Sequence, residues 1–439
     1  MKLRYLLFLS IALLLAQNLD AKPIRPRKIR KLLKHSEVLQ THFTGFALYD
    51  IQKQKMLVEQ LSDKYFTPAS NTKLYTFYAG LKLLKDSLPG VQYIIKNDSL
   101  IFWGAGDPTF LHPDFADQPI LNKLKNSGKK LYWAAGRYQG DFYGMGWSYD
   151  DYNEYYQPEI SELPLYGNVI RTQVQNNTLV GSPTLSPNGI FKLITDSTKT
   201  SGRFSLRRDI FSNEFYKPAV PMPITYRQEI PFKADTATIS RLLKANLPNY
   251  AGIIHYSKPA QVNTWYGAKR DSVLKHMMLP SDNFIAEQLL LSYAVENKLP
   301  MSAEAVIDHM LKNFLTDLPD KPQWVDGSGL SRQDLFTPRD MVKLCEKIYQ
   351  EIGNEAKLFD FLPQGGKSGT LRNLYKSADG PFVFAKTGSL SNNHNLSGFL
   401  KTRSGKTLIF SFMNNNYVRP TADVRSEMER IITYIHQNY

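Results

Sequence analysis

The chain has 439 residues, 42% of them hydrophobic and 21% charged, which is enough for two or three domains with a substantial apolar core. The formal net charge of +14 is uneven, because residues 1–34 carry +8 and the other 405 residues carry +6. A nearly balanced body argues against nucleic acid as a partner. Cys345 is the single cysteine and no histidines stand at metal-ligand spacing, so we expect no disulfide, no metal and no cofactor.

The N-terminus has the pattern of a secretory signal. Lys2 and Arg4 precede an apolar run, residues 5–16, that is too short to cross a bilayer. The sequence therefore predicts a signal peptide over residues 1–21 and a periplasmic protein, with an uncleaved membrane anchor as the alternative. The basic segment 22–34 suits peripheral contact with anionic membrane lipids or wall polymers, or else a solvated lead-in to the first helix.

Strand patterning comes first in the body of the chain. Residues 42–50 and 55–60 are predicted strands. In the following FTPASNTKLYTFYAGLKLL, Pro68 suits the first turn of a helix, and apolar residues recur at helical spacing. From 91 to 250, short β-type runs alternate with Gly, Pro, Asn and Asp turns. This texture predicts a mostly β insert, either as one domain or as two nested subdomains.

Helical patterning returns near Asp271, with helices predicted at 271–278, 284–297, 302–314 and 338–352. Strands follow at 382–386, 396–401 and 407–413, and a closing helix begins near Thr421. Two strands from the N-terminal end and three from the C-terminal end make a five-stranded antiparallel sheet flanked by helices the most economical fold, of α+β class. The main domain then comprises residues 22–90 and 251–439.

The first of three short motifs is Ser70-Asn71-Thr72-Lys73. Residues three apart share a helix face, so Lys73 is expected to reach the Ser70 hydroxyl. A lysine with a lowered pKa can take the serine proton. In the first turn of a helix, backbone N–H groups and the helix dipole favour a developing oxyanion. This pattern predicts a nucleophile and its base.

The second motif is Ser281-Asp282-Asn283, just before a predicted helix. Here Ser281 suits a proton relay toward a leaving group. The Asn283 amide suits either a substrate carbonyl or the orientation of Lys73. Asp282 receives no role.

The third motif is Lys386-Thr387-Gly388-Ser389, at the end of the predicted strand 382–386. An edge strand there can pair with an extended peptide. Lys386 and Thr387 suit a terminal carboxylate, and Gly388 lets a substrate backbone come close. Ser-x-x-Lys also occurs at Ser127 and Ser272, so the order and setting of the three motifs carry the specificity.

In this order the motifs resemble those of the penicillin-recognising serine enzymes. More narrowly, the chain resembles the D-alanyl-D-alanine carboxypeptidase/endopeptidase family, the class C low-molecular-mass penicillin-binding proteins. The matching stretches are FTPASNTKL, GAGDPTF, MLPSDNFIAEQLL, VDGSGLSR, SGTLRN and AKTGSLSNNHNLSGF. The resemblance implies a β-lactamase/transpeptidase-like fold with a large insert, although residues 217–232 depart from the family pattern.

The resemblance also implies an acyl-enzyme mechanism on peptidoglycan stem peptides, with β-lactams acylating the same serine. It assigns the nucleophile to Ser70, the general base to Lys73 and a proton relay to Ser281. Substrate binding falls to Asn283, Lys386, Thr387 and Gly388, with the backbone N–H groups of Ser70 and Ser389 as the oxyanion hole.

The sequence is also compatible with two other functions. One is a β-lactamase or esterase on the same fold, and another is a catalytically weak peptidoglycan-binding scaffold. Ser328, in Asp326-Gly327-Ser328-Gly329, is interpreted as part of a structural turn. Arg372 suits either a substrate carboxylate or a structural ion pair, and His276 and His394 suit packing roles.

Overall fold

The computed structural model describes residues 25–439, so the predicted signal peptide lies outside the described residues. The chain forms two compact units. The first holds the chain up to Pro68, Pro319–Lys321 and Phe336–Tyr439, and the second holds Ala69–Leu318 and Pro322–Leu335.

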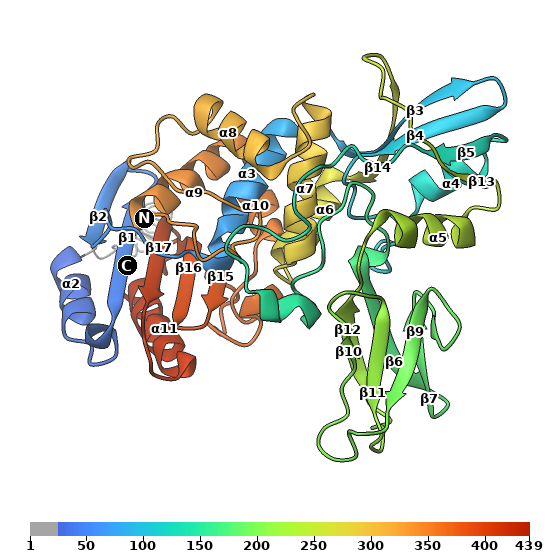
Figure 1. Ribbon diagram of the computed structural model, residues 1–439. Coiled ribbons are helices and arrows are strands. Elements are labelled where there is room, and N and C mark those ends of the chain that lie inside the picture. The colour runs from blue at the N-terminus through green and yellow to red at the C-terminus, as the bar shows by residue number, and fades with distance from the viewer. Residues whose placement is uncertain (1–24) are drawn as a thin grey trace, which may run out of the picture. The chain divides into compact units, whose positions relative to one another are not determined.

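The first unit is built on a five-stranded antiparallel sheet in the order β15-β16-β17-β1-β2 (Figure 1). Phe46 lies opposite Phe412 at the centre of this sheet, where strands from the two chain ends pair. The predicted sheet is thereby confirmed. Its strands are β1 (Phe43–Asp50), β2 (Lys55–Gln60), β15 (Val383–Leu390), β16 (Asn393–Lys401) and β17 (Thr407–Asn415).

Helices cover both faces of this sheet. Phe46 belongs to the core shared with α2 (Pro26–Lys34) and α11 (Thr421–Asn438). Successive strand residues face opposite sides, and a side chain at Gly45 would meet Pro338, the first residue of α9 (Pro338–Ile352). The α9 helix, which is followed by α10 (Glu355–Phe361), therefore lies on the other face. Thr337 caps α9 by accepting from the Asp340 N–H.

The first described helix is fixed to the last one. Ile29 and Leu33 of α2 are buried in the core of the sheet, and the Lys28 ammonium lies 5.0 Å from the ring centre of Tyr434 in α11. The apolar face of α2 is therefore used inside this unit, while its basic side chains are exposed. Membrane contact through segment 22–34 stays a prediction.

The second unit holds three further sheets and a group of helices. Most of its strands fall in the segment predicted to be β-rich, although the predicted boundaries at 91 and 250 stay a prediction. One sheet has the order β13-β5-β4-β3-β14, the second β12-β6-β7 and the third β10-β11-β9-β8. Their strands are β3 (Ser87–Lys96), β4 (Ser99–Gly104), β5 (Lys130–Trp133), β6 (Val169–Gln175), β7 (Thr178–Ser182), β8 (Leu185–Ser186), β9 (Phe191–Asp196), β10 (Arg207–Arg208), β11 (Glu214–Pro218), β12 (Arg227–Pro231), β13 (Tyr250–Ile253) and β14 (Asn263–Lys269).

The helices of the second unit pack around α7 (Asn283–Glu296), whose residues from Phe284 to Val295 are all buried. α3 (Lys73–Leu83), α6 (Arg270–Met278) and α8 (Ala303–Asn313) contact it, and α4 (Pro119–Lys125) and α5 (Thr236–Asn246) pack with the strands. A helix apolar all round needs such a surrounding. Across residues 25–439, none of the helices combines the length and apolar character needed to cross a bilayer.

Candidate active site

Ser70 and Lys73 meet at the start of α3. Lys73 Nζ lies 2.9 Å from Ser70 Oγ, as the three-residue spacing predicts. The local structure differs from the prediction in one respect. Ser70 lies in a 3-10 turn, Ala69–Thr72, and α3 begins only at Lys73. Ala69 has a φ of 49°, a strained value for a residue with a Cβ, so the turn that presents Ser70 is held by its surroundings.

The Lys73 ammonium is fully buried and has three polar neighbours. Besides Ser70 Oγ, it donates to Asn283 Oδ1 at 2.6 Å and to the Ser328 carbonyl at 2.8 Å. Burial lowers the pKa of Lys73 to about 8, even though the carboxylates of Asp326 and Glu287 oppose this shift. A lysine with such a pKa is neutral in a substantial fraction of molecules near neutral pH, which a proton acceptor requires.

The second motif lies at the turn between α6 and α7. Asn283 is the first residue of α7, and its Nδ2 donates to the Tyr156 carbonyl while its Oδ1 accepts from Lys73. Asp282 caps α7 by accepting from the Ile285 N–H at 2.8 Å. Ser281 has a φ of 67°, which marks a second strained residue in this neighbourhood. The structure thus brings Ser70, Lys73 and Asn283 together.

Three buried carboxyl groups close to Lys73, those of Glu287, Asp326 and Asp334, were not predicted from the sequence. Glu287 accepts from the Gly327 N–H at 2.9 Å and from the Ser328 N–H at 2.7 Å. Asp326 accepts from the Trp147 indole at 2.9 Å and from two loop N–H groups, and Asp334 accepts from the Val325 N–H at 2.7 Å. These bonds shape the loop whose Ser328 carbonyl receives the Lys73 ammonium.

The same loop approaches the turn that carries Ser70. Gly329 has a φ of 81°, and a Cβ there would lie 1.9 Å from the Ala69 carbonyl oxygen. Only glycine fits this position. Ser328 Oγ accepts from the Leu330 N–H at 3.3 Å, which agrees with its interpretation as a turn residue.

A signal for Glu287 exists in the sequence. It stands four residues after Asn283, so both side chains project from one face of the same helix. Burial and the neighbouring Asp326 raise the pKa of the Glu287 carboxyl, and the same two causes raise that of Asp334. Both groups therefore hold protons at a pH where exposed carboxyls have lost them.

We expect Glu287→Gln to lower the free energy of unfolding by about 1 to 3 kcal/mol, because an amide nitrogen would face a backbone N–H that now has an acceptor. Urea unfolding measures the change. Glu304→Gln on the neighbouring helix α8 is the matched control, because Glu304 is exposed and its replacement should change stability by less than about 1 kcal/mol. Equal losses in the two variants would contradict this role.

The pH dependence of stability gives a second measure of Glu287. The folded state keeps a proton that the unfolded state releases near the ordinary glutamate pKa of about 4.3. Stability therefore falls as the pH rises from that value through the raised pKa. Glu287→Gln should remove its share of this slope, leaving the shares of Asp334 and of other carboxyls with a raised pKa, such as Asp107 and Asp340.

The third motif lies on β15 in the first unit. The predicted strand end at Lys386 is wrong, because β15 continues through Lys386-Thr387-Gly388-Ser389 to Leu390, paired with β16 throughout. The prediction of an edge strand is right. Backbone bonds from segment 363–365 cover the outer edge only as far as Ala385, and from Lys386 onward no further strand pairs there within residues 25–439.

Side chains of the third motif form hydrogen bonds with β15 itself and with neighbouring segments of the first unit. Lys386 is buried, and its Nζ donates to the Thr387 carbonyl at 2.8 Å. Thr387 Oγ1 lies 2.8 Å from Thr370 Oγ1, and Ser389 Oγ lies 2.7 Å from His394 Nδ1. Burial lowers the pKa of His394 to about 3, so this ring is neutral.

The structure also shows the surroundings of Arg372 and His276, whose roles the sequence did not decide. Arg372 directly follows the turn Gly369–Leu371 that carries Thr370, is exposed, and forms no ion pair in the described part of the chain. His276 packs its ring 4.6 Å from that of Phe115, which is the packing role considered from the sequence.

Comparison with known proteins identifies the fold. The crystal structure of penicillin binding protein 4 (dacB) from Haemophilus influenzae superposes with a TM-score of 0.74 at 19% identity, covering 93% of this chain and 99% of that chain. The predicted α+β, β-lactamase/transpeptidase-like fold is therefore confirmed. This fold and the Ser70–Lys73 pair are those expected from the resemblance to the class of penicillin-recognising serine enzymes.

Sequence comparison narrows this class. A model of the D-Ala-D-Ala carboxypeptidase 3 (S13) family matches residues 26–198 and 258–437. The chain belongs to this family, which confirms the predicted resemblance. The D-alanyl-D-alanine carboxypeptidase DacB of Haemophilus influenzae is 24% identical over 88% of each chain. Carboxypeptidase DacB of Mycolicibacterium smegmatis is 33% identical over 154 residues, and this alignment spans a third of that protein.

Proposed function

We propose that the protein is a serine-type D-Ala-D-Ala carboxypeptidase of peptidoglycan stem peptides that works through an acyl-enzyme on Ser70. The observation that carries this proposal is the buried Lys73 amine, 2.9 Å from Ser70 Oγ, with its pKa lowered to about 8. Membership of the family and the likeness to a D-alanyl-D-alanine carboxypeptidase support it.

The proposed reaction begins with Ser70 Oγ attacking the carbonyl carbon of the penultimate D-alanine while neutral Lys73 takes the hydroxyl proton. The tetrahedral intermediate collapses, the C–N bond breaks, and the terminal D-alanine leaves as an amine after receiving a proton through Ser281. Water then hydrolyses the ester and restores the Ser70 hydroxyl. The same chemistry would cut a D-alanyl cross-link, which is endopeptidase work.

Binding roles extend this proposal. Asn283 holds Lys73 in place and offers its amide to the substrate. Lys386 and Thr387 bind the terminal carboxylate, Gly388 allows close approach, and the backbone N–H groups of Ser70 and Ser389 stabilise the oxyanion. The outer edge of β15 from Thr387 onward, on which no further strand pairs within residues 25–439, supports a role in binding an extended peptide. We further propose export to the periplasm, from the signal-like N-terminus.

Release of D-alanine tests this function. Purified protein should remove the terminal residue from diacetyl-L-Lys-D-Ala-D-Ala and not from the same peptide ending in L-alanine, as mass spectrometry of the shortened peptide shows. Coupled oxidation of free D-alanine measures the rate. Absence of release from the D-alanine peptide, with fast hydrolysis of nitrocefin, would instead favour a β-lactamase.

A further inference from the structure

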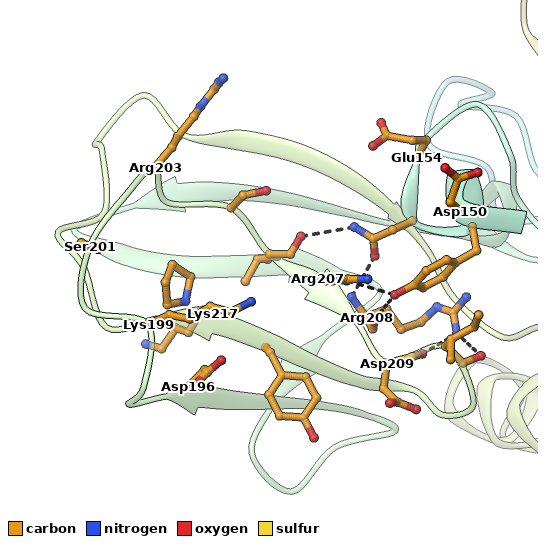
Figure 2. Close-up of a pocket in the computed structure, with 17 residues that line it drawn as sticks. Asp150, Glu154, Asp196, Lys199, Ser201, Arg203, Arg207, Arg208, Asp209 and Lys217 are labelled. Atoms are coloured by element: carbon orange, nitrogen blue, oxygen red, sulfur yellow. Dashed lines mark hydrogen bonds between the residues drawn. The ribbon is translucent and has the colours of Figure 1, made fainter.

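A cavity of about 630 Å³ lies in the second unit, outside the residues assigned to Ser70 chemistry. It is formed by the 3-10 turn Tyr149–Asn153, by β10 and β11, and by the loop that precedes β10 (Figure 2). We call it the β10 cavity. Its size is that of sites for peptides or small molecules.

One residue that lines the β10 cavity, Arg208, is held in place by buried contacts. Arg208 is only 1% exposed, and its guanidinium donates to the Pro231 carbonyl at 2.9 Å and to the Asp209 carbonyl at 2.8 Å. Its Cζ lies 5.4 Å from the ring centre of Tyr152, whose hydroxyl donates to the Arg208 carbonyl at 3.1 Å. This arginine is therefore part of the scaffold, and ligand binding falls to the other cations of the cavity.

Four cations of the β10 cavity have no ion pair in the described part of the chain: Lys199, Arg203, Arg207 and Lys217. Lys192 of the same sheet is different, because it pairs with Glu214 at 3.2 Å. Two carboxylates of the cavity are already used in turns, since Asp196 accepts from the Thr198 N–H and Asp209 from the Phe211 N–H. Asp196 stays charged beside Lys199 and offsets part of its charge, so the end that holds Lys199 and Lys217 keeps a smaller net positive charge.

The other end holds two exposed carboxylates, on a turn that Arg207 and Arg208 also contact. Figure 2 shows Lys199 and Lys217 at one end of the cavity and Asp150 and Glu154 at the far end. Both carboxylates are exposed and form no ion pair within residues 25–439. A ligand that satisfies both ends has carboxylates along its length and one ammonium group.

The cations and the exposed carboxylates of the β10 cavity come from two different segments of the chain. The match to the family model leaves out residues 199–257, and all four cations lie in this unmatched segment. Asp150 and Glu154 belong to a segment that continues to Tyr156. The Tyr156 carbonyl accepts a hydrogen bond from Asn283 Nδ2 at 3.0 Å. Asn283 in turn contacts Lys73 at 2.6 Å. The cavity is thus linked through one short segment to the proposed catalytic pair.

We propose that the β10 cavity is a second binding site for an acidic peptide that carries one free ammonium group. This is the chemistry of a wall stem peptide, and that part of the inference rests on the proposed function. A bound peptide at this site would hold one strand of the wall polymer while Ser70 acts on another, which raises the local substrate concentration.

Isothermal titration with the tripeptide N-acetyl-L-Ala-γ-D-Glu-L-Lys, which carries two carboxylates and one ammonium group, tests this site in the full chain carrying Ser70→Ala. This probe lacks the D-Ala-D-Ala terminus, so its binding is measured independently of catalysis and of the outcome for D-alanine release. Lys199→Gln with Lys217→Gln should weaken binding about tenfold or more, as expected for lost charge-assisted contacts. Lys192→Gln is the matched control and should leave binding unchanged.

Three results would overturn the proposal: no measurable binding, equal weakening by Lys192→Gln, or unchanged binding of a probe whose carboxylates are amidated. Inorganic polyphosphate that binds as tightly as the tripeptide would also overturn it, because it would show a surface for polyanions in general. Circular dichroism of the double variant checks its folding, since Lys199 is exposed and Lys217 is half-buried on β11.

Discussion

Ser70→Ala is expected to abolish covalent labelling by a fluorescent penicillin, to less than about one thousandth of the wild-type rate. The structure places the Ser70 hydroxyl 2.9 Å from the buried Lys73 amine. Ala fits this position without new contacts, so the variant should fold. Labelling followed by gel fluorescence against time measures the loss.

Ser127→Ala is the matched control for this experiment. Ser127 also begins a Ser-x-x-Lys match, but it lies in the turn after α4, where its Oγ donates to the Leu124 carbonyl at 2.8 Å. This variant should label at the wild-type rate. Equal labelling of Ser70→Ala and wild type would remove the nucleophile assignment.

Lys73→Met should lower the acylation rate by about 10² to 10⁴, the range for loss of a general base. Methionine keeps most of the volume of the buried side chain while removing the amine that contacts Ser70 and Asn283. Stopped-flow acylation by a chromogenic β-lactam measures the rate. An acylation rate equal to that of wild type would show that another group takes the serine proton.

The pH profile distinguishes a base from a merely structural lysine. Because burial lowers the pKa of Lys73 to about 8, the neutral amine forms as the pH rises through this value. The wild-type acylation rate should therefore rise with pH and level off above about 8. Lys73→Met should show a flat profile over the same range, and a wild-type profile without this step would argue against the role of Lys73.

The sheet of the first unit could be predicted from the sequence because each strand carries its own pattern. Residues 407–413 alternate toward two covered faces, and the turn residues at either side mark the ends. Thr337 and Pro338 likewise mark the start of α9. These signals are local, so one sequence suffices to find them.

The predicted start of α3 and end of β15 were wrong for a common reason. Tertiary contacts set both boundaries. The turn around Ser70 is 3-10 with a strained Ala69, and the close approach of Gly329 shows how tightly the surrounding loop confines it. Similarly, β15 continues past Lys386 because β16 pairs with it as far as Asn393. Neither contact leaves a trace in the local sequence.

The buried carboxyl groups below Lys73 could not be predicted from the sequence for a different reason. Glu287 and Asp326 are far apart in the sequence. They come close because Glu287 accepts from the Gly327 and Ser328 N–H groups, which directly follow Asp326 in the loop. Acidic residues are ordinarily exposed, so composition alone favours a solvated role for them. The helix spacing from Asn283 to Glu287 was the available signal.

The central claim is an acyl-enzyme on Ser70, and mass spectrometry of the intact wild-type protein tests it most directly. After brief exposure to benzylpenicillin, the protein should gain the mass of one penicilloyl group. Tandem spectra of the peptide that spans residues 65–73 should place this group on Ser70. An adduct on Ser281 or Ser328, or no adduct at all, would contradict the assignment.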